Sequence, residues 1–493
     1  LPTLFFYFPD LWYNRSMLNT LKKLFPRRLF RALQPAYHFI MGWLAALFYR
    51  FPSRKLIVIG VTGTAGKTSL VYLIAKMLSS AGYKTGFTST TVLSDGDHEW
   101  LNDKKMTMPG RSFVQKILRR MVVSGCRYAI VETTSEGIKQ FRHRFINYDV
   151  VVFTSLYPEH IESHGSFARY KEAKGRLFSH LKRGRSKYIN ADRVVSTAKT
   201  GLKKLELARV KKTIIVNGDD AEAEYFLNFW SEAKVVFSFN PQAEAGLFIK
   251  NLAGEARVDD FSLVRGGQVM AGADGTKLEI DGQELNLQLL GEFNAVNALA
   301  AYAVGLNQSL PFEIIKPGLE SVKSLAGKME RIDAGQDFQF IVDYSFEPKA
   351  LEKLYSTIDL IPHNRLIHIL GSTGGGRDKA RRPILGRLAG AKADIVVVTN
   401  EDPYDEDPQK IIGQVAAGAE EAGKQLGQNL FMNLDRREAI NKALELAKKG
   451  DLVLLTGKGA EQAICVAHGR KIPWDDREAA RIAIVDKMCI DKK

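Results

Sequence analysis

Cysteine is scarce in this sequence of 493 residues. The three that occur, Cys126, Cys465 and Cys489, lie far apart and form no CxxC pair. This spacing excludes the disulfide framework of a small secreted protein and a zinc site built from paired cysteines. It fits a chain that works in a reducing cytoplasm, which is the location that we expect.

A long, uninterrupted apolar run is also missing. The best candidate, residues 35–51, contains His38 and Arg50 and has only 17 residues, which is marginal for crossing a bilayer. No small-residue cleavage site follows it, which argues against a signal peptide. The composition, 45% hydrophobic and 25% charged, is that of a globular protein, and the length predicts two or three domains.

Acidic residues are almost absent from the first 55 residues, which hold nine Lys or Arg and one acid, Asp10. This segment therefore carries +8 of the net charge of +15. Its basic residues alternate with bulky apolar ones, as in segments that lie at an anionic membrane surface. A helical hairpin packed on the main body is an equal alternative. We expect a separate basic segment over residues 1–54, a peripheral membrane contact through residues 17–55, and no nucleic-acid partner.

The clearest motif is GVTGTAGKTS at residues 60–69, directly after the apolar run KLIVI. The run is typical of a buried parallel strand, and the stretch after the motif has helical spacing up to Gly82. A glycine-rich connection of this kind lets backbone N–H groups approach phosphates. Lys67 would reach the β- and γ-phosphates, and Thr68 would bind Mg²⁺. A plain glycine-rich turn is the alternative, because Val61 stands where the usual loop has a glycine.

Four other segments carry chemistry or a fold signal. The strand AIVE delivers Glu132 to its carboxyl end, where ligands bind in open α/β sheets. Residues 151–178 read VVFTSLYPEHIESHGSFARYKEAKGRLF, and residues 289–305 read LLGEFNAVNALAAYAVG. In the C-terminal third, the strands LIHILGS, DIVVVTN and DLVLLTGKG alternate with helical stretches, which predicts a doubly wound sheet.

Together, and in this order, the loop and these segments resemble the Mur ligase superfamily over roughly residues 55–484. Its members are ATP-dependent amide-bond ligases of peptidoglycan precursor synthesis, and the C-terminal motifs are similar to those of UDP-N-acetylmuramoyl-tripeptide synthetases. The resemblance implies an α/β protein with a central P-loop domain and a C-terminal Rossmann-like domain. We place these domains at residues 55–327 and 328–493, joined by a linker near Lys328. Residues 212–290 have alternating strands and glycine turns, so we expect them to form an antiparallel extension.

The resemblance also implies the roles of individual residues. Lys67, Glu132, His160 and Lys174 would be catalytic, and Thr68, Glu132, His160 and Lys174 would hold Mg²⁺, with Lys174 as a carbamate. From the residues alone, an imidazole is an unusual Mg²⁺ ligand and Lys174 is one of 70 basic residues.

The binding residues implied for ATP are Gly63, Thr64, Ala65, Gly66, Lys67, Thr68, Ser69, Asn294, Asn297, Arg331 and Asp343. Those implied for a muramyl-peptide acceptor are Thr107, Ser135, Gln140 and Arg142. Those implied for the incoming amino acid are Arg377, Asp402, Tyr404, Gly457 and Glu461. The family's histidine after the second serine is Glu136 here, so the resemblance implies no acceptor contact at this position.

Two departures from the family bear on the substrates. Diaminopimelate-adding relatives carry Asp-Asn-Pro-Arg where this sequence has Glu401-Asp402-Pro403-Tyr404. A second substrate carboxylate would lose an arginine partner and meet Asp402, so we expect an amino acid with a neutral or cationic side chain.

The phosphate loop begins at residue 60, which leaves no room for the family's uridine-binding domain. We therefore expect an acceptor that is UDP-linked with reduced uridine recognition, or lipid-linked.

The implied reaction phosphorylates a substrate carboxylate with ATP, and an amino acid then attacks the acyl phosphate. Two other interpretations remain open. A folylpolyglutamate synthase-like ligase also lacks the uridine domain, but RDKARRP and GKGAEQ argue against it. A non-catalytic, membrane-associated NTP-binding subunit is opposed by the presence of Glu132, His160 and Lys174.

Overall fold

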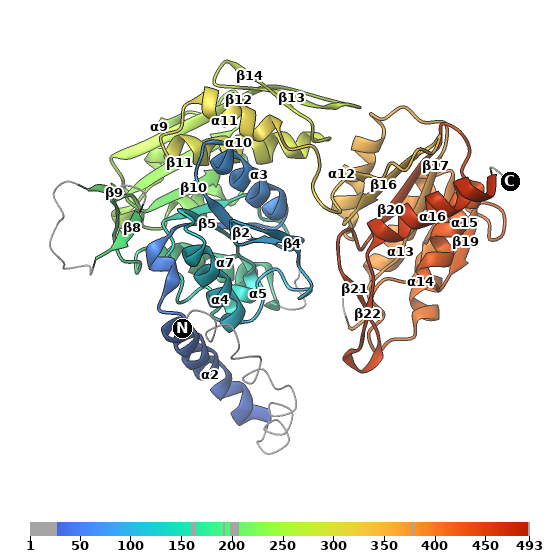
Figure 1. Ribbon diagram of the computed structural model, residues 1–493, viewed down its shortest axis with the longest axis horizontal. Coiled ribbons are helices and arrows are strands. Elements are labelled where there is room, and N and C mark those ends of the chain that lie inside the picture. The colour runs from blue at the N-terminus through green and yellow to red at the C-terminus, as the bar shows by residue number, and fades with distance from the viewer. Residues whose placement is uncertain (1–26, 159–163, 191–192, 198–206, 377–378, 492–493) are drawn as a thin grey trace.

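The computed structural model describes residues 27–158, 164–190, 193–197, 207–376 and 379–491. They form two α/β lobes, and helix α2 (Arg27–Phe48) extends from the first lobe (Figure 1). His160 and Arg377, two of the predicted site residues, lie outside the described residues.

An eleven-stranded mixed sheet forms the frame of the first lobe, in the order β14-β13-β12-β11-β10-β6-β1-β5-β2-β3-β4. Its strands are β1 (Ile57–Thr62), β2 (Thr85–Thr88), β3 (Val92–Ser94), β4 (Glu99–Leu101), β5 (Tyr128–Glu132), β6 (Val150–Phe153), β10 (Thr213–Asn217), β11 (Ala233–Ser238), β12 (Asp260–Gly272), β13 (Gly275–Ile280) and β14 (Gln283–Leu287). Every residue of β1 is buried between the parallel strands β5 and β6. Such burial on both faces explains why β1 is an unbroken apolar run.

The sheet corrects one expectation. Within residues 212–290, only β12, β13 and β14 form antiparallel pairs, β12 with β13 and β13 with β14. Strand β10 pairs in parallel with β6 and β11, and β11 pairs in parallel with β12. The short helices α8 (Ala223–Leu227) and α9 (Ala245–Lys250) follow β10 and β11. Each of these helical crossovers returns the chain for another parallel strand.

Helices cover both faces of this sheet. Helices α3 (Lys67–Ser80), α10 (Glu292–Asn307) and α11 (Phe312–Glu320) pack on one face with the apolar cluster around Ile59 and Val61. Helices α4 (Arg111–Val123), α7 (Phe167–Leu181) and α8 pack on the other face. The short helix α5 (Ser135–Lys139) follows β5, and a small sheet is formed by β7 (Lys187–Asn190), β8 (Arg193–Ser196) and β9 (Ala208–Val210).

The second lobe has a six-stranded sheet in the order β15-β16-β20-β17-β18-β19, parallel except for β15. Its strands are β15 (Glu330–Arg331), β16 (Gln339–Asp343), β17 (Leu366–Leu370), β18 (Ile395–Thr399), β19 (Leu430–Asn433) and β20 (Leu452–Thr456). Helices α12 (Pro348–Ile358), α13 (Arg381–Lys392) and α14 (Pro408–Glu421) pack on one face, and α15 (Arg436–Leu446) and α16 (Asp476–Asp491) on the other. The hairpin of β21 (Ala463–Cys465) and β22 (Lys471–Pro473) lies beyond β20. The expected α/β fold with a doubly wound C-terminal part is confirmed.

Helix α2 packs on α4 through its small residues. Gly42 and Ala46 are buried, and a Cβ atom on Gly42 would lie 3.1 Å from the ring of Phe145. After a short turn the chain enters the 3₁₀ helix η2 (Pro52–Lys55) and then β1. The described part of the segment thus consists of α2 and η2, and residues 1–26, on which the hairpin alternative depends, lie outside the described part. Within that part, no helix combines the length and the apolar character needed to cross a bilayer.

Candidate active site

The loop between β1 and α3 approaches its neighbours closely at two glycines. A Cβ atom on Gly63 would lie 1.9 Å from Thr154 Oγ1, and one on Gly66 would lie 2.5 Å from Asn297 Oδ1. Gly66 also has a φ of 81°, a backbone conformation that is unfavourable for residues with a side chain. It is the N-cap of α3, so it has no side chain to occupy the first N–H groups of the helix. No side chain therefore caps the N-terminus of α3 at the end of the loop, and an uncapped helix N-terminus is a geometry that binds phosphate.

The neighbouring strand end holds this loop in place. The Thr64 amide donates to Ser155 O at 2.7 Å, and Thr154 Oγ1 donates to Ala65 O at 2.6 Å. Lys67 Nζ donates to Thr64 O at 2.7 Å, within the loop itself. Its ammonium thus lies over the loop, where a bound phosphate would replace the carbonyl as its partner.

Glu132, at the end of β5, is the centre of a buried oxygen network. Its carboxylate accepts hydrogen bonds from Thr68 Oγ1 at 3.0 Å, the Thr90 amide at 2.8 Å and Thr90 Oγ1 at 3.0 Å. Thr90 Oγ1 also lies 2.8 Å from Thr107 Oγ1. Thr90 was not predicted, because its position after β2 gains meaning only when β2 pairs with β5.

The Thr68 and Glu132 oxygens suit Mg²⁺, a hard cation that takes oxygen ligands and keeps several positions for water or phosphate. Among the described residues, no group of three or more His, Cys, Asp or Glu side chains could hold a metal. A metal here would thus complete its shell with phosphate oxygens and water.

Lys174, on α7, reaches the loop from the other side. It is 1% exposed, and its Nζ donates to Gly63 O at 2.7 Å and lies 4.6 Å from the centre of the Tyr170 ring. Tyr170 Oη lies 3.2 Å from Thr64 Oγ1. A lysine that is almost fully buried at the phosphate loop is more than a surface charge, because desolvating an ammonium is costly.

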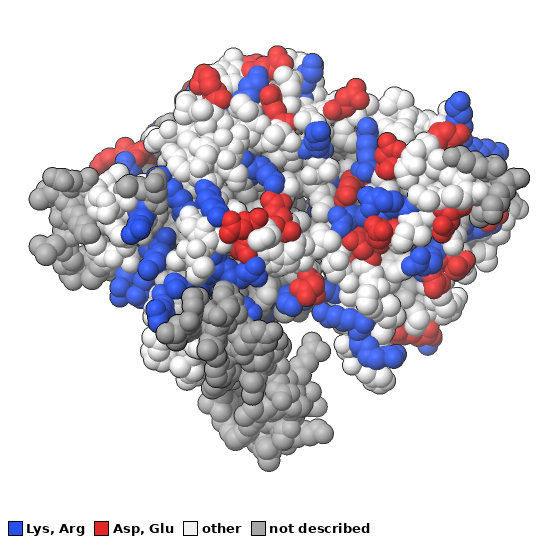
Figure 2. Space-filling view, in the orientation of Figure 1, with Lys and Arg blue, Asp and Glu red and all other residues white. Residues whose placement is uncertain are grey.

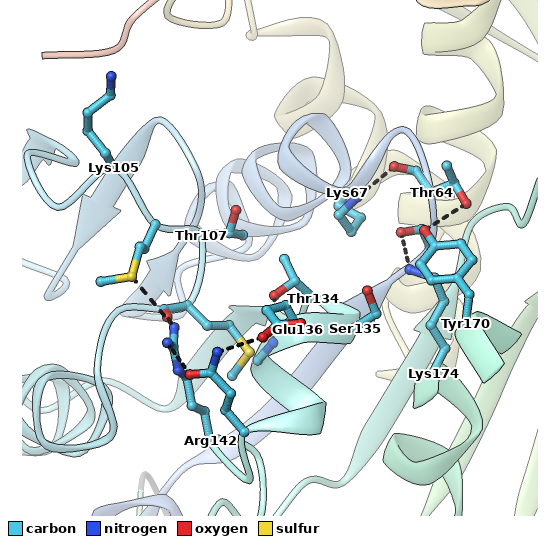
Figure 3. Close-up of a pocket in the computed structure, with 15 residues that line it drawn as sticks. Thr64, Lys67, Lys105, Thr107, Thr134, Ser135, Glu136, Arg142, Tyr170 and Lys174 are labelled. Carbon is cyan, nitrogen blue, oxygen red and sulfur yellow. Dashed lines mark hydrogen bonds between the residues drawn. The ribbon is translucent and has the colours of Figure 1, made fainter. Parts of the chain in front are cut away.

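A cavity of about 340 Å³ opens beside the loop (Figure 3). Its lining includes the predicted acceptor residues Thr107, Ser135, Gln140 and Arg142 together with Gly63, Thr64, Lys67 and Lys174. Arg142 Nη2 donates to Gln140 Oε1 at 2.7 Å, and Ser135 Oγ lies 3.1 Å from His164 Nε2. Segments far apart in the chain thus meet around one cavity next to the phosphate loop.

The other predicted nucleotide contacts lie at different distances from the loop. Asn297, on α10, lies against Gly66, and its Nδ2 donates to Asn294 Oδ1 at 3.3 Å. Asn294 Nδ2 in turn donates to Leu290 O at 2.8 Å. Arg331 donates to Ala273 O at 2.7 Å, and Asp343 accepts from the Met329 amide at 2.8 Å. These last two side chains therefore hold the connection between the lobes.

In the second lobe, predicted amino-acid contacts gather where β18 and β20 end. Asp402 Oδ1 accepts from the Cys465 amide at 2.7 Å and from Lys458 Nζ at 2.9 Å, and Lys458 Nζ donates to Glu461 Oε2 at 2.5 Å. A Cβ atom on Gly457 would lie 2.0 Å from Glu401 Oε1. Tyr404, with a φ of 51°, donates its amide to Cys465 O at 3.1 Å. Lys458 was not predicted, because only the fold places it beside Asp402.

A loop with phosphate-binding geometry, side-chain oxygens suited to Mg²⁺ and a cavity beside them are typical of an enzyme that uses a nucleoside triphosphate. Comparison with known proteins specifies the class. Residues 61–211 match the Mur ligase middle domain, and residues 327–459 match the Mur ligase, glutamate ligase domain.

Two relatives cover most of the chain. A UDP-N-acetylmuramyl-tripeptide synthetase of Roseiflexus sp. is 35% identical over 90% of this chain and 81% of its own length. A UDP-N-acetylmuramoyl-L-alanyl-D-glutamate--2,6-diaminopimelate ligase of Halalkalibacterium halodurans is 32% identical over 91% of this chain and 82% of its own.

Solved structures show the same fold. A UDP-N-acetylmuramoyl-L-alanyl-D-glutamate--2,6-diaminopimelate ligase has a TM-score of 0.53 at 24% identity, over 88% of this chain and 79% of that one. A Mycobacterium tuberculosis folylpolyglutamate synthase complexed with ADP has a TM-score of 0.59 at 16% identity, over 84% of this chain and 91% of that one.

The chain belongs to the Mur ligase family and is an ATP-dependent ligase that forms amide bonds. It is an amino-acid-adding ligase of peptidoglycan precursor synthesis, and Mur ligases use ATP and Mg²⁺.

Proposed function

We propose that this ligase joins an amino acid to the carboxylate of a muramyl-peptide acceptor through an acyl-phosphate intermediate. One observation carries the proposal: the phosphate loop, Lys174 and the acceptor residues Ser135, Gln140 and Arg142 line a single cavity. A carboxylate bound there would lie next to the γ-phosphate of ATP. The names of the two relatives, a tripeptide synthetase and a ligase of a muramoyl dipeptide, support an acceptor of this class.

The residues would act mainly by position and charge. Lys67 would hold the β- and γ-phosphates, and Thr68 and Glu132 would hold Mg²⁺, which neutralises charge on the transferring phosphoryl group. The acceptor carboxylate takes the γ-phosphoryl group, and ADP leaves. The α-amine of the amino acid attacks the acyl carbon, loses a proton, and the tetrahedral intermediate expels phosphate. Ser135, Gln140 and Arg142 would orient the acceptor during both steps.

We propose further that Lys174 acts as a carbamate. Its neutral amine would add CO₂ and release a proton, which gives an anion able to help hold the metal. Its burial and its position at Gly63 support this role. His160 is proposed as a further metal ligand on the resemblance alone.

We assign residues 55–327 to the ATP-binding domain and 328–493 to the amino-acid-binding domain. The linker near Lys328–Arg331, which follows α11 and includes β15, is proposed as the point about which the domains close around the substrates. Arg331 and Asp343, which now hold this connection, would reach the nucleotide only on closure. Asp402, Tyr404, Gly457, Glu461 and Arg377 are proposed to face the amino acid.

The amino acid is proposed to have a neutral or cationic side chain, with lysine as one candidate. Asp402 and Glu461 support this, because both carboxylates lie at the proposed side-chain subsite with a single lysine of the same lobe between them. A second carboxylate on the substrate would be repelled there.

We also propose that α2 contacts an anionic membrane surface at the inner face of the cell membrane. Its outward side exposes large apolar residues: Phe39, Ile40, Trp43, Leu44, Leu47 and Phe48. Figure 2 shows Lys and Arg side chains gathered on the side of the first lobe from which α2 extends. An apolar face beside positive charge is typical of binding at a lipid interface. Such a surface would suit a lipid-linked acceptor, and a UDP-linked acceptor is the alternative.

A screen of ADP release over muramyl-peptide acceptors, UDP-linked and lipid-linked, and over amino acids tests this function. We expect release to require both substrates together and to be lost in Lys67→Ala, which removes the charge at the γ-phosphate but leaves the fold intact. Release with folate and glutamate would instead favour a folylpolyglutamate synthase, whose structural likeness shows the fold alone. No release with any pair would favour a non-catalytic subunit.

A further inference from the structure

An ion cluster joins the two lobes. Lys105 lies between β4 and α4 in the first lobe, and its Nζ lies 2.8 and 2.7 Å from the two Asp402 oxygens and 3.2 Å from Glu461 Oε2 in the second. The side chains of Lys105 and Asp402 are 7% and 9% exposed. The contact is therefore a buried ionic bridge, not a loose surface pair.

Asp402, Glu461 and Lys458 form a recess of the second lobe whose charges do not balance without Lys105. Asp402 and Glu461 provide two carboxylates, and Lys458 provides one ammonium between them. The nearby Arg436 is already paired with Asp476 at 2.7 Å. Burial would raise the pKa of Asp402, but Lys458 and Lys105 bring it below its ordinary value. Because an uncompensated buried charge is costly, this recess requires one more cation.

The segment that carries Lys105 also borders the acceptor cavity. Lys105 lines the edge of that cavity together with Met106, Thr107 and Met108, and its side chain points away from Lys67 and Lys174 (Figure 3). Lys105 has a φ of 53°, which a non-glycine residue rarely adopts. The residue that forms the bridge thus has an unfavourable backbone conformation.

We propose that Lys105 is a specificity-determining residue, a tethered cation that occupies the subsite for the side-chain ammonium of the incoming amino acid. This inference rests on the proposed ligase function. An amino acid with a side-chain ammonium displaces Lys105 and keeps the recess neutral. A small neutral amino acid, such as alanine, binds while Lys105 stays in place. Lys105 therefore competes with the side chain of lysine and weakens lysine binding, but it does not compete with alanine.

The test compares Lys105→Met, which keeps the stem and removes the charge, with Lys105→Arg, which keeps the charge. Lysine and alanine binding are measured by calorimetry on the full chain, and KM and kcat are measured for both amino acids. In Lys105→Met we expect lysine to bind at least about fivefold more tightly, because no competitor remains. Alanine should bind no better, and Lys105→Arg should bind lysine no better than the wild type.

The matched control is Lys104→Met, which removes the same charge from the adjacent residue, whose exposed side chain pairs with Asp103. It should leave lysine binding unchanged. Equal weakening of lysine and alanine by Lys105→Met would make Lys105 a structural residue or a partner of the substrate carboxylate, and would overturn the proposal. Unchanged lysine binding in Lys105→Met, or no lysine binding to either protein, would overturn it too. The binding comparison needs no turnover, so it remains decisive even if the proposed ligase reaction fails.

Discussion

At the scale of single residues, the most informative side chain is Lys174. It is almost fully buried and lies against the phosphate loop. If it works as a carbamate, Lys174→Ala should lose most ADP formation, and formate or acetate should restore part of it by replacing the missing anion. Steady-state assays with and without added formate measure this.

Lys171→Ala is the control, since Lys171 lies on the same helix and pairs with Glu222 at 2.8 Å at the surface. It should retain activity. Electron density that shows a bare Lys174 amine in an active, nucleotide-bound crystal would contradict the carbamate.

His368, on β17, predicts a pH dependence of stability. Burial lowers the pKa of His368 to about 3. Its Nδ1 lies 2.7 Å from Tyr355 Oη and its Nε2 lies 3.0 Å from Thr456 Oγ1, so the neutral ring satisfies both hydroxyl groups. The unfolded chain takes up this proton near pH 6.5, so stability falls as the pH drops below that value.

At pH 5 this one group should cost about 2 kcal/mol of the free energy of unfolding relative to neutral pH. His368→Gln keeps a donor and an acceptor but cannot titrate, so its stability should fall less steeply in acid. Urea unfolding of the second lobe between neutral pH and pH 5 measures the difference. His98→Gln, at a side chain that is 79% exposed, should behave as wild type. An acid slope in His368→Gln equal to that of the wild type would refute this account.

At the scale of elements, α2 reverses the usual amphipathic pattern, in which large apolar residues face the protein. Its small residues face the protein and its large apolar residues face outward. Replacing Trp43 and Leu47 by serine should weaken binding to anionic vesicles at least about tenfold, because each buried apolar side chain contributes roughly 1.5–3 kcal/mol. Co-sedimentation with vesicles at increasing salt measures this, and salt should weaken wild-type binding by screening.

Leu247→Ser, on the exposed side of α9, is the control and should bind as wild type. If the α2 double variant binds vesicles as well as the wild type does, the membrane contact is wrong and the helix serves only to pack on α4.

At the scale of the whole molecule, our proposal places amino-acid selection between the lobes. In a competition among diaminopimelate, lysine, ornithine, alanine and glutamate, we expect diaminopimelate not to be preferred. Its distal carboxylate would approach Asp402 and Glu461, whereas a lone ammonium would replace Lys105. Mass spectrometry of the ligated products measures the preference. Asp402→Asn should reduce the advantage of lysine, and a clear preference of the wild type for diaminopimelate would disprove this interpretation.

The sequence by itself determined what depends on short stretches of chain. Local patterns predicted the strand, glycine loop and helix around Lys67 and the position of Glu132 at a strand end. They also predicted the alternation of strands and helices in the second lobe. Only the tertiary structure decided which of these patterns meet. The pairing of β2 with β5 brought Thr90 within hydrogen-bond distance of Glu132, and β10 and β11 paired in parallel. The tertiary structure also brought Lys105 to Asp402 across 297 positions of the chain. Such contacts carry no local signal, because the two residues of the ion pair belong to lobes built on different sheets.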